Sequence, residues 1–381
     1  MSLDELRAEI DAIDDEIAPL LARRMGISAQ VAMIKRETGG AILQPEREKA
    51  ILARLGAGVE EQYRPALAII YEAVFRASRE YQRGLLAAPG DSPLRQEFEE
   101  AAALGAGGFP ENAVVACQGI EGAYSHLAAL RIFREPEVQF LRTFDAVFRA
   151  VVLGQCRYGV LPIENSSFGS VTPVFDLLKR HRCKIVRAAR LPIAHCLLSR
   201  AEALEDIKEI YTHEQALGQC GKFLEKLSPW TTLTVCENTA VAARMVAESD
   251  RADTAAISSE ECAALYGLRV LKRGIQNEAR NETRFICIAR QAEIYPGANK
   301  SSVLLTLQHR PGSLARLLQL VSAAGINLTK LETRPVPGRN FEFLFYLDME
   351  CDASQPASAG FLEEIARQSE DFFFLGSYTE R

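Results

Sequence analysis

Apolar residues in the first part of the chain recur at intervals of three and four, the spacing of one face of an α-helix. The apolar stripe runs from Leu3 to Ile34 and stops before Gly39–Gly40, which predicts one long helix that ends there. Two shorter helices are predicted, one starting near Pro45 and one over about residues 64–86. This part of the chain contains no run typical of a β-strand.

The long stripe has more apolar surface than two shorter helices can cover. We therefore expect it to pack against a second copy of the chain, which would give an intertwined homodimer or a higher homo-oligomer. Pro19 lies inside the stripe, where it removes a backbone hydrogen bond, so we expect a bend near residues 15–19.

After the helical region the pattern changes twice. Residues 88–111 are rich in Gly, Pro, Ala and charge and are interpreted as a linker that contains a short helix. Over residues 112–290, apolar strands alternate with helices, which predicts an α/β region with two lobes. From residue 300 to 381 the predicted order is βαββαβ, typical of a small ferredoxin-like α+β sandwich. The chain is thus expected to be multidomain, with an all-α bundle at 1–87.

Composition narrows the function classes. The 381 residues are 48% hydrophobic and 25% charged, with a net charge of −6 and no block of Lys and Arg, so we expect no nucleic-acid partner. The pattern contains no apolar run of about 18 residues and begins on an acidic segment, so we expect a cytoplasmic protein without a membrane anchor. The nine cysteines form no CxxC pair, which disfavours zinc and disulfides and favours reduced core thiols, with a nucleophilic cysteine as the alternative.

Four polar residues interrupt the buried helical stripes. Arg24 occupies an apolar heptad position, and Lys35 lies about three turns further on the same face. Ser78 and Gln82 likewise break the stripe of the third helix. Buried polar groups are costly unless they are matched. One such residue could set the helix register, but a cationic pocket for a dicarboxylate explains all four better.

The motifs "LRAEIDAIDDEI", "LLARR", "IK", "ERE" and S-x-x-x-Q, spread over about residues 3–86, resemble the all-helical chorismate mutases. The resemblance implies that Arg24 and Arg47 hold the substrate carboxylates and that Gln44 makes its contact through the backbone. It also implies that Arg7 reaches into the partner's site. Arg7 lies about 260° around the helix from Arg24, at about 100° per residue, which fits that role.

The same resemblance places Lys35 and Gln82 beside the ether oxygen of chorismate, Glu48 on a substrate hydroxyl and Ser78 in the pocket wall. These residue types suit a Claisen rearrangement, which moves no proton and forms no nucleophile. The enzyme's task is to hold the substrate in a reactive chair and to stabilise charge on the breaking C–O bond. Gln82 donates a hydrogen bond without requiring protonation.

In the α/β region, "YGVLPIENSSFGSV" is a buried strand that ends in polar residues, where α/β proteins commonly hold ligands. A polar turn that only caps the next helix remains the alternative. The segment "ACQGIEGAYSHLAAL" is a second strand, loop and helix. It lacks the GxGxxG pattern, which disfavours a dinucleotide and leaves an anion such as a carboxylate.

Five motifs, "GAYSHLAA", "LPIENSSFGSV", "HCLL", "YTHEQALGQC" and "NETRF", resemble prephenate dehydratase over residues 112–290. The resemblance implies a fold with two lobes like a periplasmic binding protein, with Thr283 as the essential hydroxyl. Ile120 replaces the Pro usual in this family's Gly-Pro turn. The implied substrate-binding residues are Glu164, Asn165, Ser166, Gln215, Thr283, Arg284 and Phe285, with Arg284 as a carboxylate partner.

The last unit resembles the phenylalanine-sensing ACT domain through its G-[AS]-L and E-[ST]-R-P motifs. The resemblance implies that phenylalanine binds as an allosteric effector at a seam between paired domains. A dimerisation module without ligand is the alternative. The implied effector-binding residues are Gly312, Ser313, Leu314, Glu332, Thr333, Arg334 and Pro335.

Together the resemblances predict a bifunctional enzyme that converts chorismate to prephenate and prephenate to phenylpyruvate, under feedback by phenylalanine. The motifs imply no metal and no organic cofactor. One rival is a dehydratase whose helical domain serves only for dimerisation, and another is a non-catalytic amino-acid sensor. Prephenate and arogenate stay open as dehydratase substrates, as do dimer and tetramer.

Overall fold

The computed structural model describes residues 2–38, 42, 44–86, 92–227, 230–278, 280–335 and 343–380. The chain forms two compact units, Met1–Asp91 and Ser92–Arg381. The expected helix break at Gly39–Gly40 and the domain boundary at 87–88 lie outside the described residues. In the described part of the chain, no helix is both long enough and apolar enough to span a bilayer.

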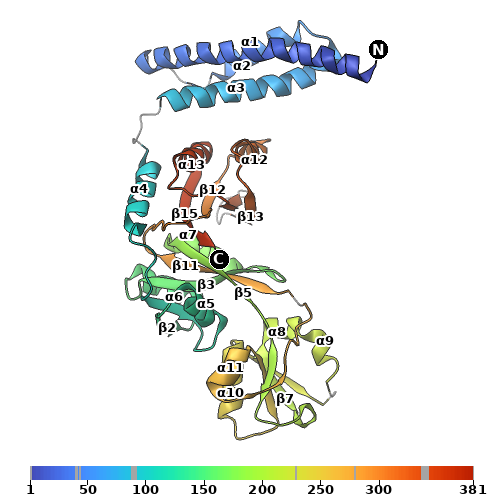
Figure 1. Cartoon of the computed structure of the whole chain (residues 1–381), viewed down its shortest axis with the longest axis vertical. Helices are drawn as coiled ribbons and strands as arrows, with labels where there is room; N and C mark the ends of the chain where they lie inside the picture. Colours follow the sequence, from blue (N-terminus) through green and yellow to red (C-terminus); the bar gives the residue numbers. More distant parts are fainter. Residues whose placement is uncertain are drawn as a thin grey trace. The chain divides into compact units, whose positions relative to one another are not determined.

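The first unit consists of the three predicted helices, α1 (Leu3–Thr38), α2 (Pro45–Gly56) and α3 (Arg64–Leu86), with a short 3₁₀ turn, η1 (Glu61–Tyr63), before the third (Figure 1). Helix α1 runs through Pro19 without a break in its helical assignment. Both α1 and α2 pack on α3.

Much of the apolar stripe of α1 stays uncovered within one chain. Large apolar side chains such as Ile10 (57% exposed) and Leu20 (63%) face solvent, whereas Ser28 and Ala32 are buried. Burial of apolar area contributes about 25 cal/mol per Å². The exposed stripe is therefore an unused source of stability in this unit.

Helix α4 (Pro93–Gly105) opens the second unit, within the segment interpreted as a linker. Its buried Phe98 stacks edge-on against Phe374, with ring centroids 4.7 Å apart. At Gly105 the helix passes so close to the following fold that an added Cβ would lie 2.0 Å from the Ile294 carbonyl oxygen. This helix is thus part of the core of the C-terminal unit.

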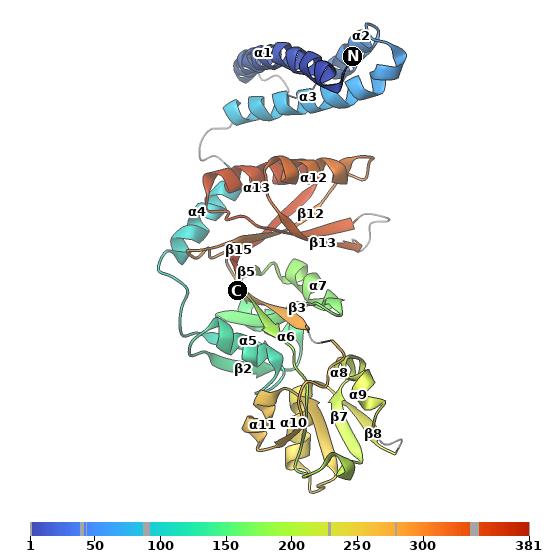
Figure 2. The ribbon, with the colours of Figure 1, turned by 45° about the vertical axis from the view of Figure 1, so that its right-hand side comes forward.

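The first lobe of the α/β region is built on a mainly parallel sheet in the order β5-β11-β3-β1-β2, with β11 antiparallel to both neighbours. The strand β4 pairs only with β3. Helix α5 lies on one face and helices α6 and α7 on the other (Figure 2). The elements are β1 (Val114–Gln118), α5 (Tyr124–Ile132), β2 (Glu137–Leu141), α6 (Phe144–Val152), β3 (Tyr158–Asn165), β4 (Gly169–Ser170), α7 (Thr172–His181), β5 (Lys184–Pro192) and β11 (Glu282–Ala289).

Between β5 and β11 the chain leaves the first lobe and builds a second one. Its five-stranded sheet has the order β10-β6-β9-β7-β8. The elements are β6 (Cys196–Ser199), η2 (Leu204–Asp206), β7 (Glu209–His213), α8 (Glu214–Gln219), α9 (Gly221–Leu224), β8 (Thr232–Cys236), α10 (Thr239–Glu248), β9 (Thr254–Ser258), α11 (Glu260–Tyr266) and β10 (Arg269–Lys272). The chain thus crosses between the lobes twice, which accords with the predicted pair of lobes.

The C-terminal elements have the predicted order βαββαβ and the sheet order β13-β14-β12-β15, as in a ferredoxin-like sandwich. The sheet does not stop there, because β15 also pairs in parallel with β5. The elements are β12 (Lys300–Thr306), α12 (Ser313–Ala323), β13 (Leu328–Pro335), β14 (Phe343–Met349), α13 (Pro356–Gln368) and β15 (Asp371–Glu380).

Glycine is required where β15 meets β5. Gly376 has φ +151°, and an added Cβ would lie 2.0 Å from the carbonyl oxygen of Ile185. The close approach lets one continuous sheet run from the first lobe into the C-terminal sandwich.

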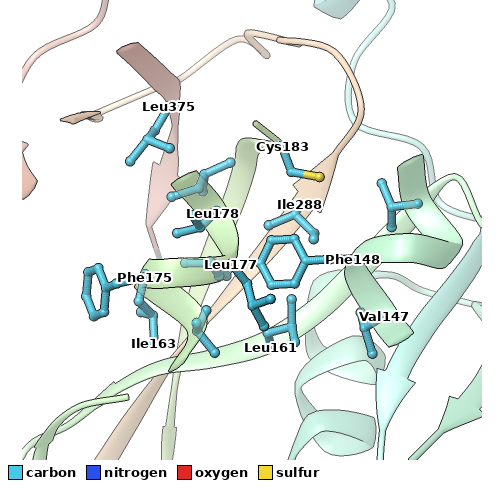
Figure 3. Close-up of a cluster of buried hydrophobic side chains, with 14 of the residues drawn as sticks. Val147, Phe148, Leu161, Ile163, Phe175, Leu177, Leu178, Cys183, Ile288 and Leu375 are labelled. Atoms are coloured by element: carbon cyan, nitrogen blue, oxygen red, sulfur yellow. The ribbon is translucent and has the colours of Figure 1, made fainter. Parts of the chain in front are cut away.

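The hydrophobic core crosses the same boundary. Figure 3 shows Phe148 and Leu178 of the first lobe in one cluster with Leu375 of the sandwich. Phe175 stacks edge-on against Tyr346, with ring centroids 4.7 Å apart. A shared core and a shared sheet join the sandwich to the first lobe.

The nine cysteines are free thiols, and all but Cys236 are buried. Burial raises the pKa of Cys117 to about 12, which keeps its thiol protonated. This environment favours cysteine as a core residue over cysteine as a nucleophile.

Candidate active sites

A cavity of about 630 Å³ lies among the three helices of the first unit. Residues from all three helices line it, which explains why apolar stripes on α1 and α3 carry charged and amide side chains. Seven of the eight residues implied by the mutase resemblance line this one cavity: Arg24, Lys35, Gln44, Arg47, Glu48, Ser78 and Gln82.

Hydrogen bonds order the polar wall of the cavity. Arg24 donates to the Ser78 hydroxyl, which in turn donates to the Val74 carbonyl oxygen at 2.9 Å. The Arg24 guanidinium also lies 5.6 Å from the centre of the Phe75 ring. Lys35 Nζ donates to the carbonyl oxygen of Ile42 at 3.0 Å. These contacts hold the two cations in place.

Burial lowers the pKa of Lys35, and the nearby positive charge of Arg47 lowers it further, while Glu48 opposes the shift. An anion entering the cavity would relieve this repulsion between cations. Gln82 is 7% exposed, and its Oε1 atom has no hydrogen-bond partner in the described part of the chain. The cavity wall therefore carries excess positive charge available to a dicarboxylate, with the Gln82 amide in the same wall.

Arg7 is the mutase residue that the structure does not bring into this cavity. It lies near the start of α1, exposed, and pairs with Asp4 at 3.5 Å. The role of Arg7 at a partner's site therefore stays a prediction.

In the second unit, the polar ends of β3 and β11 lie side by side. Thr283 pairs with Asn165 and Arg284 with Glu164, but Phe285 pairs with Pro162, so Ile163 is an extra residue on β3. This β-bulge changes the direction of the side chains that follow it. Opposed residues of an antiparallel pair project from the same face, so the two pairs serve opposite sides of the sheet.

Asn165 organises the first pair. Its Oδ1 atom accepts hydrogen bonds from the backbone N–H groups of Ser167 at 2.9 Å and Phe168 at 3.0 Å. Since backbone N–H groups only donate, the amide nitrogen must face the other way, where it donates to Asn281 Oδ1 at 2.7 Å and Thr283 Oγ1 at 2.9 Å. The Thr283 hydroxyl therefore accepts from Asn165 and keeps its own proton for another acceptor.

Glu164 and Arg284 form the second pair, on the side of the C-terminal sandwich. Arg284 is 3% exposed; its Nε atom lies 2.7 Å from Glu164, and its Nη1 atom lies 2.6 Å from Asp348 and 3.1 Å from Glu380. Burial opposes ionisation of Glu164, but Arg284 and Lys330 hold its pKa below the ordinary value. The substrate-binding roles implied for Glu164 and Arg284 stay predictions, because here both side chains bind protein groups.

The other implied dehydratase residues are more scattered. Ser166 continues the pairing of the strand ends, since its N–H donates to the Glu282 carbonyl oxygen at 2.8 Å and its hydroxyl accepts from Glu282 N at 2.9 Å. Gln215 is exposed at the start of α8 in the second lobe. Phe285, on β11, is 2% exposed, and its side chain packs in the hydrophobic core of the first lobe.

The two implied effector motifs lie on the sandwich. Gly312 caps α12 with φ +81°, ahead of Ser313 and Leu314. Along β13, alternate residues are half-buried and exposed, so Thr333 and Pro335 face outward. Glu332 accepts a hydrogen bond from Ser170 at 2.7 Å, and Arg334 pairs with Asp176 at 3.2 Å. The charged members of this motif thus contact the first lobe.

Sequence reasoning missed several residues of this region. Asn281, 4% exposed, lies inside the motif "NETRF", but the resemblance gave it no role. Lys330, Asp348 and Glu380 lie far from Glu164 and Arg284 in the chain. They contact these two residues only because the sandwich packs against the first lobe. No local motif could have identified them.

Comparison with known families agrees with the geometry of both units. Residues 6–83 match chorismate mutase type II, and residues 115–293 match prephenate dehydratase. The fold and sites therefore define a protein that joins a mutase domain of the isomerase class to a dehydratase domain of the lyase class.

A relative from Aquifex aeolicus, named bifunctional chorismate mutase/prephenate dehydratase, is 31% identical over 377 residues, which cover 99% of this chain and 97% of the relative. The chain belongs to this family, the bifunctional chorismate mutase/prephenate dehydratases.

Two solved structures resemble the second unit. The prephenate dehydratase of Arthrobacter aurescens in complex with L-Phe has a TM-score of 0.63 and 29% identity, covering 70% of this chain and 90% of that one. A chain described as a novel type of quorum quenching acylase also has a TM-score of 0.63, with 30% identity, covering 70% of this chain and 98% of that one. Because one fold can carry different activities, the assignment must rest on the site residues and the full-length relative.

Proposed function

We propose that the protein carries out two consecutive reactions, chorismate to prephenate in the helical unit and prephenate to phenylpyruvate in the α/β region. The observation that supports the first reaction best is the single cavity lined by seven of the eight implied mutase residues. It also argues against a helical domain kept only for dimerisation, which would have no reason to keep buried polar groups.

In the mutase reaction, Arg24 and Arg47 bind the two carboxylates of chorismate and hold the substrate in its reactive chair. Lys35 and the Gln82 amide then stabilise negative charge on the ether oxygen as the C–O bond breaks and the new C–C bond forms. No proton moves. We propose that Arg7 of a second copy completes the site, with the exposed stripe of α1 as the dimer contact.

In the dehydratase reaction, the C–C bond to the ring carboxylate breaks and carbon dioxide leaves. The electron pair forms a ring double bond and expels the C4 hydroxyl, which takes up one proton and departs as water. We propose that the Thr283 hydroxyl donates a hydrogen bond to this leaving group. Asn165 already occupies the acceptor side of Thr283, so the hydroxyl proton is directed away from Asn165.

We propose phenylalanine as the effector of the sandwich, which we interpret as an ACT domain. The two motifs support this proposal, and so does the similarity to the Arthrobacter aurescens dehydratase, whose structure was solved in complex with L-Phe. The shared sheet provides a mechanical connection from that domain to the dehydratase lobe.

The test is to supply purified protein with chorismate and follow prephenate and phenylpyruvate, with and without phenylalanine. We expect both products in turn and less phenylpyruvate when phenylalanine is present. Protein that ignores chorismate but consumes prephenate would be a monofunctional dehydratase, and protein that turns over neither would be a sensor. Supplying arogenate in parallel distinguishes the two dehydratase substrates.

A further inference from the structure

Arg79 lies inside the S-x-x-x-Q motif, directly after Ser78 and three residues before Gln82, yet the mutase resemblance gives it no role. Residues three apart share one side of a helix, and Arg79 and Gln82 both line the cavity of the first unit. The Arg79 Nη1 atom donates a hydrogen bond to the Glu48 carboxylate of α2, and the two side chains are 21% and 26% exposed. This ion pair is therefore part of the cavity wall.

The charges on the cavity wall are unequal. Among the described residues that line it, one is a carboxylate, Glu48. The cations are Arg23, Arg24, Lys35, Arg47 and Arg79. A lone carboxylate among several cations has a choice of partners, and attraction between unit charges is stronger in a partly buried site than in water. In the described part of the chain, the ion pair that Glu48 forms is with Arg79.

Lys35 is the cation that Glu48 would otherwise attract. Burial and Arg47 lower the pKa of Lys35, and Glu48 is near enough to oppose that shift. The Lys35 ammonium nevertheless forms no ion pair with a described carboxylate and donates to the Ile42 carbonyl oxygen at 3.0 Å. A direct pair between Lys35 and Glu48 would occupy the positive charge that the reaction requires at the ether oxygen, where negative charge develops.

We propose that Arg79 is a positioning residue of the mutase site. It binds the Glu48 carboxylate and holds it away from Lys35, which leaves the Lys35 ammonium available to the ether oxygen of chorismate. The same contact keeps Glu48 in place for the substrate hydroxyl. The inference rests on the proposed mutase function and on the roles that the resemblance implies for Lys35 and Glu48.

The test compares R79M with R76M in the full-length protein. Methionine replaces much of the apolar stem of arginine but removes its charge. Arg76 is a matched control, because it is another half-buried arginine of α3, three residues earlier, and it does not line the cavity. We expect R79M to lower mutase kcat about tenfold or more, as when catalytic groups are misplaced, and R76M to keep it. R79K should recover part of the loss, and each variant should still dehydrate prephenate.

The pH profile of the mutase separates positioning from a general loss of packing. In R79M one cation is lost and Glu48 is free to approach Lys35, and both changes favour the charged form of Lys35. The decline of kcat/KM at alkaline pH should therefore move to higher pH than in wild type. A variant that only loosened the helix would leave this decline where it is, and that result would count against the proposal.

A double-mutant cycle with E48Q tests whether Arg79 acts through Glu48. If it does, R79M costs little kcat in the E48Q background, whereas independent effects would add. Additive losses, or equal kcat in R79M and R76M, would overturn the proposal. A higher KM with unchanged kcat would also overturn it, because Arg79 would then bind the substrate itself. If R79M is too unstable to purify, R79Q replaces it throughout. Wild-type protein that does not convert chorismate would instead refute the mutase function.

Discussion

Thr283 and Arg284 are adjacent in β11, yet they serve opposite sides of the same sheet. The Thr283 hydroxyl accepts a hydrogen bond from Asn165, whereas Arg284 is enclosed by Glu164, Asp348 and Glu380. Beyond the β-bulge at Ile163, strand β3 places Glu164 opposite Arg284 and Asn165 opposite Thr283. One tripeptide motif thus contributes to the proposed chemistry and to the attachment of the sandwich.

The Thr283 hydroxyl should be essential to the dehydratase and irrelevant to the mutase. Replacing it by valine keeps the shape but removes the donor, so we expect T283V to lose at least about 10²-fold in kcat for phenylpyruvate formation, as when a donor to developing charge is removed. T283S keeps the donor and should retain more activity. Both variants should convert chorismate to prephenate normally. Substantial dehydratase activity in T283V would exclude the hydroxyl as the donor.

Replacing Gln82 by glutamate should make the mutase dependent on pH. A neutral carboxylic acid can donate a hydrogen bond to the ether oxygen, but a carboxylate cannot and repels its growing negative charge. Q82E is therefore expected to be active at acidic pH and to lose activity as pH rises and the carboxyl ionises. The measurement is mutase kcat/KM from mildly acidic to mildly alkaline pH, with wild type as the control. A flat profile for Q82E would mean that this side chain does not face the breaking bond.

Arg7 and Gln82 should complement each other across a dimer. R7A and Q82A are each expected to be inactive as mutases. When they are co-expressed, random pairing makes half of the dimers mixed, and each mixed dimer has one complete site, so about a quarter of wild-type activity should return. Mixing R7A with wild-type protein is the control, because it measures how far subunits exchange between dimers. An inactive mixture despite proven mixed dimers would place Arg7 outside the partner's site.

Glu380 should stabilise the second unit in a manner that depends on pH. Burial opposes ionisation of its carboxyl, but Lys300, Arg284 and Arg190 lower its pKa from 4.5 to about 2. The folded pKa is depressed, so the stabilisation is complete above the unfolded pKa and disappears as pH falls from about 4.5 toward 2. A shift of this size corresponds to about 3 kcal/mol.

The measurement for Glu380 is urea unfolding of E380Q and wild type at neutral pH and at a pH just below the unfolded pKa. We expect E380Q to be less stable at neutral pH, with a smaller difference in acid. The control is E202Q, because Glu202 is 82% exposed in its pair with Arg269 and such pairs contribute little. Equal effects of E380Q and E202Q would show that the buried network adds no net stability.

Local patterns predicted much of this fold because the relevant forces act over a few residues. The stripe from Leu3 to Ile34 needs only helical periodicity, and the polar end of β3 needs only a buried apolar run that stops in "ENSS". The mutase cavity was predictable for the same reason: charged residues on an apolar stripe require a polar environment.

The contacts that join the sandwich to the first lobe could not be predicted in this way. The pairing of Thr379 with Arg187 depends on the whole chain between them, and the sequence around each shows no sign of the other. The position of Arg284 follows from that pairing, because its partners Asp348 and Glu380 come from the sandwich. The segment interpreted as a linker contains α4, whose buried face is evident only once Phe374 lies beside Phe98.

The pairing of β15 with β5 also affects synthesis of the protein. A ribosome completes the first lobe, including β5 and β11, well before it makes β15. Until then β5 is an uncovered sheet edge with free N–H and C=O groups, the type of surface on which nascent chains aggregate. We therefore expect the first lobe to be more prone to aggregation before β15 emerges than after β15 has paired with Arg187 and Ala188.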